Sequence, residues 1–187
     1  MSDLLRLEGV TGFRGGRILF EGLSLTLGPG EAALVIGPNG VGKSSLLRIA
    51  AGLLAPAAGS LSAAACALAD EHAALDERQR LGDALSFWAR LDGRDPDPGM
   101  AAMGLAHLAA VPVRMLSTGQ RKRATLARVI ASGAPLWLLD EPANGLDLEG
   151  QSRLAEAAAA HRAAGGAILA ASHQPLGLEG ARQVVLG

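Results

Sequence analysis

The chain has 187 residues, of which 49% are hydrophobic and 3% aromatic, and its formal net charge is −1 at pH 7. This length suits one domain with room for an inserted subdomain, and the charge argues against nucleic acid as a partner held by bulk electrostatics. A single cysteine, Cys66, excludes an internal disulfide and fits a reducing compartment.

Neither a membrane span nor a secretory signal is expected. No run reaches the roughly 18 uninterrupted apolar residues that a transmembrane helix needs. The opening MSDLLRLEGV carries acids where a secretory signal has bases followed by an apolar stretch. We therefore expect a cytoplasmic protein that reaches a membrane by docking to another protein.

The first half of the chain reads as strand, turn, strand and helix. Residues 18–27 contain the alternation LSLTL, which predicts a strand with one polar face. GPGE at 28–31 is a turn, and AALVIG at 32–37 is a short apolar run typical of a parallel strand covered on both faces. Residues 43–54 follow as a helix with leucines on one side.

Helices dominate the middle of the chain, and the strand pattern then returns. Prolines and glycines in DGRDPDPG separate the first two predicted helices. The predicted helices cover residues 82–93, 100–110, 119–132 and 148–164, and the predicted strands cover 135–141 and 165–173. This order indicates an α/β fold with a parallel-sheet core (residues 1–70 and 131–187) and a helical subdomain inserted at about 71–130.

The segment GPNGVGKSS matches the phosphate-loop pattern G-x-x-x-x-G-K-[ST]. A chance glycine turn is the alternative, but a buried strand precedes the segment and an amphipathic helix follows it. Backbone N–H groups and the helix N-terminus would meet phosphate oxygens, Lys43 would reach the β- and γ-phosphates, and Ser44 would offer a hydroxyl to Mg²⁺. The predicted ATP-binding residues here are Gly37, Pro38, Asn39, Gly40, Val41, Gly42, Lys43, Ser44 and Ser45.

Two carboxylates and a histidine follow predicted core strands. Asp140 and Glu141 end the run LWLLDE, where carboxylates of parallel strands point into the ligand crevice. Asp140 would hold Mg²⁺ and Glu141 would polarise the attacking water, although Asp-Glu-Pro could also serve as an acidic helix cap. His173 follows the last core strand, and we expect a γ-phosphate contact there although a lone histidine is more often structural.

The order of these motifs resembles the ATP-binding subunits of ABC transporters over essentially the whole chain. The resemblance rests on the phosphate loop, LSTGQ, WLLDEP, NGLD and SHQP. It implies a P-loop NTPase with a RecA-like parallel-sheet core, an N-terminal antiparallel β part and a helical insertion. It further implies that Glu141, His173 and Lys43 are catalytic, that Mg²⁺ accompanies ATP, and that integral membrane transporter subunits are partners at the cytoplasmic face of the cell membrane.

The resemblance also implies a homodimer that closes around ATP. Each nucleotide would lie between one subunit's phosphate loop and the other's signature segment, so that Ser117 and Gly119 contact the partner's γ-phosphate. Asn144 and Asp147 would belong to the segment that crosses the interface. The signature residues are Leu116, Ser117, Thr118, Gly119 and Gln120.

Three positions depart from the family pattern. Thr118 stands where the signature usually has glycine, and His72 aligns with the glutamine that usually contacts Mg²⁺. Arg14 aligns with the aromatic residue that usually stacks on adenine; its guanidinium could stack there, Phe13 could do so instead, or Arg14 is a solvated surface residue. Behind the signature, Arg121 and Lys122 are expected to form a solvated basic face, and Arg123 either belongs to it or supports the dimer interface.

Within the family, RGGRILFEGLSLTL, FWARLDG and the HQP after the last strand are similar to the branch that powers haem export in cytochrome c maturation. Three alternatives stay open. The same ATPase could serve another cargo, such as a drug, lipid or lipoprotein. It could be a soluble ABC-type ATPase acting on DNA or ribosomes, which the missing coiled-coil insertion and the charge disfavour. It could also be a regulatory module without turnover, which Glu141 and His173 disfavour.

Overall fold

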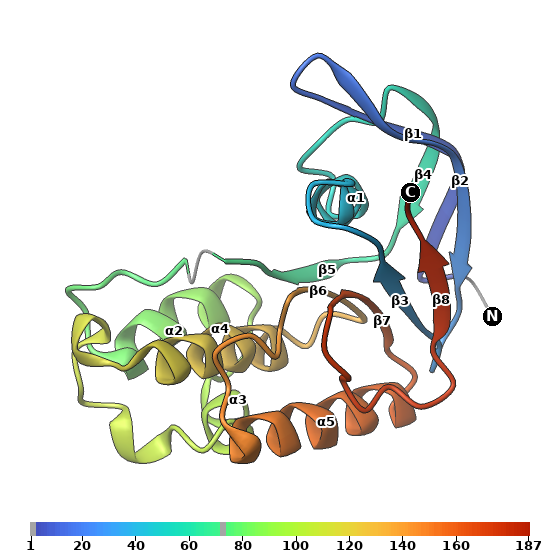
Figure 1. Ribbon diagram of the computed structural model, residues 1–187. Coiled ribbons are helices and arrows are strands. Elements are labelled where there is room, and N and C mark those ends of the chain that lie inside the picture. The colour runs from blue at the N-terminus through green and yellow to red at the C-terminus, as the bar shows by residue number, and fades with distance from the viewer. Residues whose placement is uncertain (1–2, 72–73) are drawn as a thin grey trace.

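The computed structural model describes residues 3–71 and 74–187 and contains two sheets (Figure 1). One is a three-stranded antiparallel sheet in the order β2-β1-β4, and the other is a five-stranded parallel sheet in the order β5-β6-β7-β3-β8. Helices cover the parallel sheet, as expected because parallel sheets are normally buried on both faces. The expected α/β fold with an N-terminal antiparallel part is confirmed.

The antiparallel sheet consists of β1 (Leu5–Arg14), β2 (Arg17–Leu27) and β4 (Ala58–Ala63). The predicted alternation holds in β2, where Leu25 and Leu27 are buried and Ser24 is exposed. The other two strands were not predicted. In β1 the regular alternation is interrupted by register shifts in its pairing with both neighbours, which removes the period of two from its sequence.

The parallel sheet consists of β3 (Ala32–Ile36), β5 (Cys66–Ala69), β6 (Leu136–Asp140), β7 (Ala167–Ala171) and β8 (Arg182–Val185). Every residue of β6 and β7 is buried. Along β6, Leu136 and Leu138 enter the core on the α1 side, while Trp137 and Leu139 enter the core on the other side. Two cores on opposite faces explain why these strands are continuously apolar.

The α-helices are α1 (Lys43–Ala50), α2 (Leu81–Leu91), α3 (Asp97–Ala102), α4 (Thr118–Ser132) and α5 (Leu148–Ala163). Two short 3₁₀ turns, η1 (Ala106–Leu108) and η2 (Val113–Met115), precede α4. Figure 1 shows α1 between the two sheets, whereas α2, α3 and α4 lie together beyond β5 and β6, and α5 runs beneath the parallel sheet. Ser44 in the first turn of α1 and Lys122 in the second turn of α4 are both hydrogen-bonded to Asp140, the last residue of β6.

Two helix predictions were wrong in their bounds. The helix predicted at 100–110 instead begins at Asp97 and ends at Ala102, and the rest of the segment holds only η1. Pro98 lies in the first turn, where a missing N–H costs nothing, and Gly104 follows the helix with φ of 65°, which ends it. The helix predicted at 43–54 ends four residues early, at Ala50.

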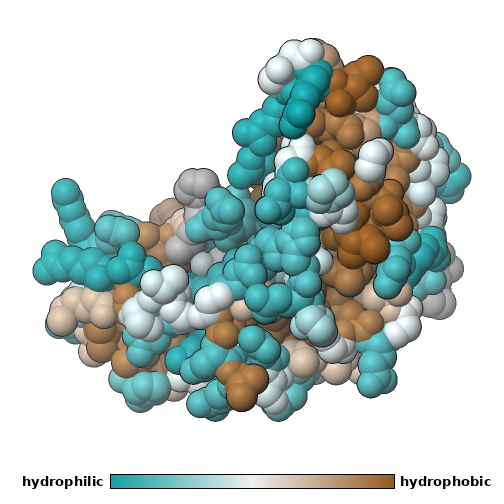
Figure 2. Space-filling model, viewed as in Figure 1, coloured by the Kyte–Doolittle hydropathy of each residue, from teal (hydrophilic) through white to brown (hydrophobic). Residues whose placement is uncertain are grey.

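Within residues 3–71 and 74–187, no helix is long and apolar enough to cross a membrane. The molecular surface is mixed. Figure 2 shows hydrophilic side chains gathered over the centre of this face and hydrophobic ones toward its upper right.

Candidate functional site

The phosphate loop joins β3 to α1 and uses glycines whose conformations side chains rarely adopt. Gly37 has φ of 149°, and a Cβ there would lie 2.3 Å from the carbonyl oxygen of Leu186. Gly42 caps α1 with φ of 117°, and a Cβ there would lie 2.9 Å from Cβ of Leu19. The loop therefore lies against β2 and the residue that follows β8 at distances that only glycine permits.

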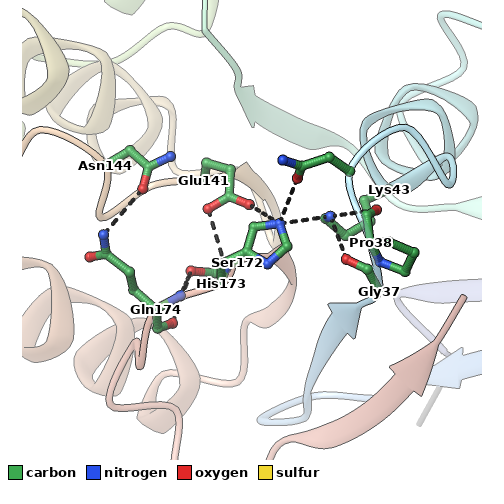
Figure 3. Close-up of polar contacts among 9 residues, drawn as sticks. Gly37, Pro38, Lys43, Glu141, Asn144, Ser172, His173 and Gln174 are labelled. Atoms are coloured by element: carbon green, nitrogen blue, oxygen red, sulfur yellow. Dashed lines mark hydrogen bonds and ion pairs between the residues drawn. The ribbon is translucent and has the colours of Figure 1, made fainter.

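Lys43 is the first residue of α1, and its side chain is 8% exposed. The amine donates to the carbonyl oxygens of Gly37 (2.8 Å) and Pro38 (3.2 Å) and lies 2.9 Å from Nε2 of His173. These contacts are drawn in Figure 3. The loop's own carbonyls thus hold the lysine at the mouth of the predicted phosphate site.

A cavity of about 690 Å³ brings together most of the residues that the sequence predicted. Except for Arg14, which ends β1, they come from the phosphate loop, the end of β6 and the segments after β6 and β7, at the carboxyl edge of the parallel sheet, where open α/β folds bind ligands. The predicted residues that line it are Arg14, Asn39, Gly40, Gly42, Lys43, Ser44, Ser45, Asp140, Glu141, Asn144 and His173.

Asp140, the last residue of β6, is 6% exposed, and its side chain is hydrogen-bonded to Ser44. Burial raises the pKa of the Asp140 carboxyl, while the Ser44 hydrogen bond and the charge of Lys122 act in the opposite direction. In the described part of the chain, no group of three or more His, Cys, Asp or Glu could hold a metal by itself. Ser44 and Asp140 suit Mg²⁺, which takes one or two protein oxygens and completes its shell with phosphates and water.

Glu141 has φ of 45°, a left-handed conformation that costs a non-glycine residue free energy. Two backbone hydrogen bonds hold it: its N–H donates to Ala171 (2.8 Å), and its carbonyl accepts from the N–H of Asn144 (3.2 Å). The carboxylate accepts from the backbone N–H of His173 (3.3 Å) and lies 3.5 Å from Nε2 of the same residue. Strain of this kind gathers at functional sites, which supports a role for Glu141.

The segment after β7 connects the phosphate loop to the segment after β6. Nε2 of His173 lies 3.0 Å from Oδ1 of Asn39. The next residue, Gln174, donates from its side-chain amide to Oδ1 of Asn144 (3.4 Å), and Ser172 holds the turn by hydrogen bonds to Gln174 N and O. Figure 3 shows this chain of contacts running from Lys43 to Asn144.

The signature segment lies at the beginning of α4, away from the cavity of its own chain. Ser117 caps the helix in a capping box, accepting from the N–H of Gln120 (3.2 Å) and donating its own N–H to the Gln120 side chain (2.9 Å). A Cβ at Gly119 would lie 3.0 Å from the carbonyl oxygen of Gly145. The φ of Thr118 is not positive, so threonine fits at this position without backbone strain.

The remaining predicted positions divide in three. Arg14 lines the cavity and Phe13 is 48% exposed on the same hairpin; neighbouring Arg17, which the sequence analysis missed, donates to the carbonyl oxygen of Gly40 (3.1 Å). Asp147 caps α5 by accepting from the N–H of Gly150 (2.8 Å). His72, predicted as a doubtful metal contact, lies outside the described residues.

The predicted solvated basic face behind the signature was wrong. Lys122 is half-buried and donates to the carbonyl oxygen of Asp140 (3.3 Å). Arg121 is also half-buried and donates to the carbonyls of Leu116 (3.1 Å) and Arg114 (3.2 Å). Their hydrogen bonds to backbone carbonyls therefore keep Arg121 and Lys122 from forming a fully solvated face.

Comparison with known proteins identifies the class. Residues 20–144 match the ABC transporter family. A solved ATP-binding subunit of an ABC transporter superposes with a TM-score of 0.87, covering 98% of this chain and 85% of that one at 22% identity, which shows the shared fold. The chain belongs to the ABC transporter family and is an ATPase of that type.

Its relatives include two proteins with the same description. The cytochrome c biogenesis ATP-binding export protein CcmA of Sphingopyxis alaskensis is 56% identical over 191 residues, covering 100% of this chain and 98% of the relative. The protein so described in Novosphingobium aromaticivorans is 58% identical over 176 residues, covering 92% of this chain and 90% of the relative.

Proposed function

We propose that this chain is the ATP-hydrolysing subunit of the haem exporter used in cytochrome c biogenesis. The description of its full-length relatives supports the export role. The observation that carries the ATPase part is the meeting of Lys43, Asp140, Glu141 and His173 around one cavity at the carboxyl edge of the sheet.

ATP binds, in this proposal, with its triphosphate on the loop from Gly37 to Ser45 and at the N-terminus of α1. The loop N–H groups and the helix dipole favour the negative phosphates, and Lys43 turns from the loop carbonyls to the β- and γ-phosphates. The adenine stacks either on Arg14, which lines the cavity, or on the neighbouring exposed ring of Phe13. Ser44 and Asp140 hold Mg²⁺, which neutralises phosphate charge when it is bound.

Hydrolysis needs a water aligned with the γ-phosphate and a group that accepts its proton. Glu141 is placed for this role because its carboxylate borders the cavity beside His173. His173 donates from Nε2 to a γ-phosphate oxygen, while Lys43 stabilises the negative charge that grows on the phosphoryl group. The partner's Ser117 and Gly119 complete the donor set from across a homodimer interface.

The dimer assembles when ATP bridges the two subunits and opens after hydrolysis. Asn144 and Asp147 lie in the segment that crosses this interface. The opening and closing moves integral membrane subunits to which the dimer is docked at the cytoplasmic face of the cell membrane. Nucleic acid takes no part, in keeping with the net charge of −1.

The function is tested by deleting the gene in its native host and measuring covalently haem-bearing c-type cytochromes. Wild-type protein should restore them and Glu141→Gln should not, although both bind ATP. Co-purification should recover integral membrane subunits with the wild-type chain. Normal cytochrome c in the deletion strain, together with loss of another exported compound, would assign a different cargo to the same ATPase.

A further inference from the structure

Lys122 connects the helix that begins with the signature to the end of β6. Its amine donates to the main-chain carbonyl of Asp140 at 3.3 Å. The residue lies in the second turn of α4, whose N-cap is Ser117. This hydrogen bond therefore joins Asp140, whose carboxylate is a proposed Mg²⁺ ligand, to the helix that would contact the partner's nucleotide.

Four carboxylates at the ends of β5 and β6 lie near enough to act on the charge of the same amine. Strands β5 and β6 are parallel neighbours with Ala69 opposite Leu139, so the residues that follow β5, Asp70 and Glu71, leave the sheet beside Asp140 and Glu141. All four carboxylates act on the charge of Lys122, while burial lowers its pKa. Asp70 is also paired with Arg48 at 3.6 Å.

The choice of residue type supports a specific role. The chain contains 17 lysines and arginines, of which only Lys43 and Lys122 are lysines. Lys43 lines the cavity and Lys122 is hydrogen-bonded to Asp140, which lines it, and arginine serves at every other Lys or Arg position. An ammonium is a compact point charge, whereas a guanidinium needs a planar space and fixed acceptors. A lysine therefore suits a narrow gap between a helix and two strand ends.

We propose that Lys122 is a positioning residue for ATP hydrolysis, which holds the end of β6 against α4 and balances its carboxylates before Mg²⁺ binds. This inference rests on the proposed function. Mg²⁺ and the ammonium are both attracted to the same carboxylates and repel each other, so each weakens the other's attraction to those carboxylates. A shift of the first turns of α4, as the partner's nucleotide binds, is carried to Asp140 through its carbonyl.

Replacing Lys122 by methionine keeps the length of the side chain and removes the charge. We expect kcat to fall about tenfold because the end of β6 loses its support, with less change in KM for ATP. The half-saturating Mg²⁺ concentration should fall about threefold because a repelling charge is gone. Lys122→Arg should restore the Mg²⁺ dependence in part. Arg90→Met, an exposed cation on α2, is the control and should match the wild type.

A second measurement needs no substitution at Lys122. Protein labelled with ¹³C-lysine gives two ε-methylene signals because the chain has two lysines, and Lys43→Arg assigns them. Adding Mg²⁺ to the ATP-bound Glu141→Gln protein should shift the Lys122 signal. A signal that ignores Mg²⁺, or a Lys122→Met variant with wild-type kcat and Mg²⁺ dependence, overturns the inference. Wild-type protein without Mg²⁺-dependent ATPase activity overturns the proposed function instead.

Discussion

The amine of Lys43 lies 2.9 Å from Nε2 of His173, although 130 positions separate the two residues. The same Nε2 lies 3.0 Å from Oδ1 of Asn39. A ring nitrogen accepts a hydrogen bond from the ammonium only when it carries no proton, and it donates to Oδ1 only when it does. A nucleotide that draws Lys43 to its phosphates therefore frees Nε2 to become a donor.

Replacing His173 by alanine should lower kcat about 100-fold, since a donor to the γ-phosphate is lost, while the affinity for ADP changes little. Steady-state ATPase assays and equilibrium binding of a fluorescent ADP separate the two effects. His107→Ala, which removes an exposed histidine on η1, is the matched control. Equal losses of ADP and ATP affinity would instead show that His173 only shapes the phosphate loop.

Glu141→Gln should lower kcat by about 10²- to 10³-fold because the amide cannot accept the proton of the attacking water. ATP still binds, so the variant should accumulate as an ATP-bound dimer. Size-exclusion chromatography with and without ATP detects that dimer, and retained nucleotide is identified by its absorbance. Wild-type turnover in this variant would mean that another group accepts the proton.

Asp140→Asn should stabilise the nucleotide-free protein by about 1 kcal/mol at pH 7 while abolishing Mg²⁺-dependent hydrolysis. Burial raises the folded-state pKa of Asp140, so the charged carboxylate lowers the free energy of unfolding. This destabilisation reaches its full size above the raised pKa. The advantage of the variant should shrink as the pH falls through the raised pKa. Urea denaturation at pH 7 and pH 4 measures it.

Asp147→Asn is the control for this measurement, because asparagine caps a helix as well as aspartate does and the free energy of unfolding should hardly change. A destabilised Asp140→Asn protein would show that the Ser44 hydrogen bond outweighs the cost of burying the charge.

His161 should make the protein lose stability as the pH falls. Its ring stacks on Trp137 with centroids 3.9 Å apart, and burial lowers its pKa below the usual 6.5. The unfolded chain therefore takes up a proton first, so this contribution is complete above pH 6.5 and is lost as the pH drops toward the lower folded-state pKa. Relative to His161→Phe, the wild-type Tm should fall about 3 °C more between pH 7 and pH 5. Parallel curves for the two proteins would contradict this.

The contact between Gln174 and Asn144 should couple the segment after β7 to the one after β6. Alanine at either position should lower kcat, and the double variant should lose less than the product of the two effects. A coupling of about three- to tenfold in kcat is expected for side chains in direct contact. Independent effects in the double-mutant cycle would show that the 3.4 Å contact does not influence catalysis.

Much of the site could be predicted because local motifs set it. The phosphate loop, Glu141 and His173 follow core strands and Asp140 ends one, and parallel strands bring their carboxyl ends to one edge. The fold class followed from the same strand–helix order. The role of each residue remains a prediction.

What the sequence did not predict depends on tertiary contacts. Strand β5 is CALA, which no propensity distinguishes from a helix, and it becomes a strand because β6 pairs with it. Lys122 reads as a surface residue because its burial comes from the approach of α4 to β5 and β6. Arg17 gives no signal either, since its partner is a carbonyl 23 positions away.

The backbone at Glu141 sets the direction in which the side chain at this position leaves the chain. Its φ of 45° and the hydrogen bonds to Ala171 and Asn144 fix the direction of the Cα–Cβ bond whatever side chain follows. Substituents at this position start from the same point and along the same vector. A series with glutamine, aspartate or serine at position 141 can therefore compare acid–base chemistry alone, whereas glycine would also relax the turn and change the direction itself.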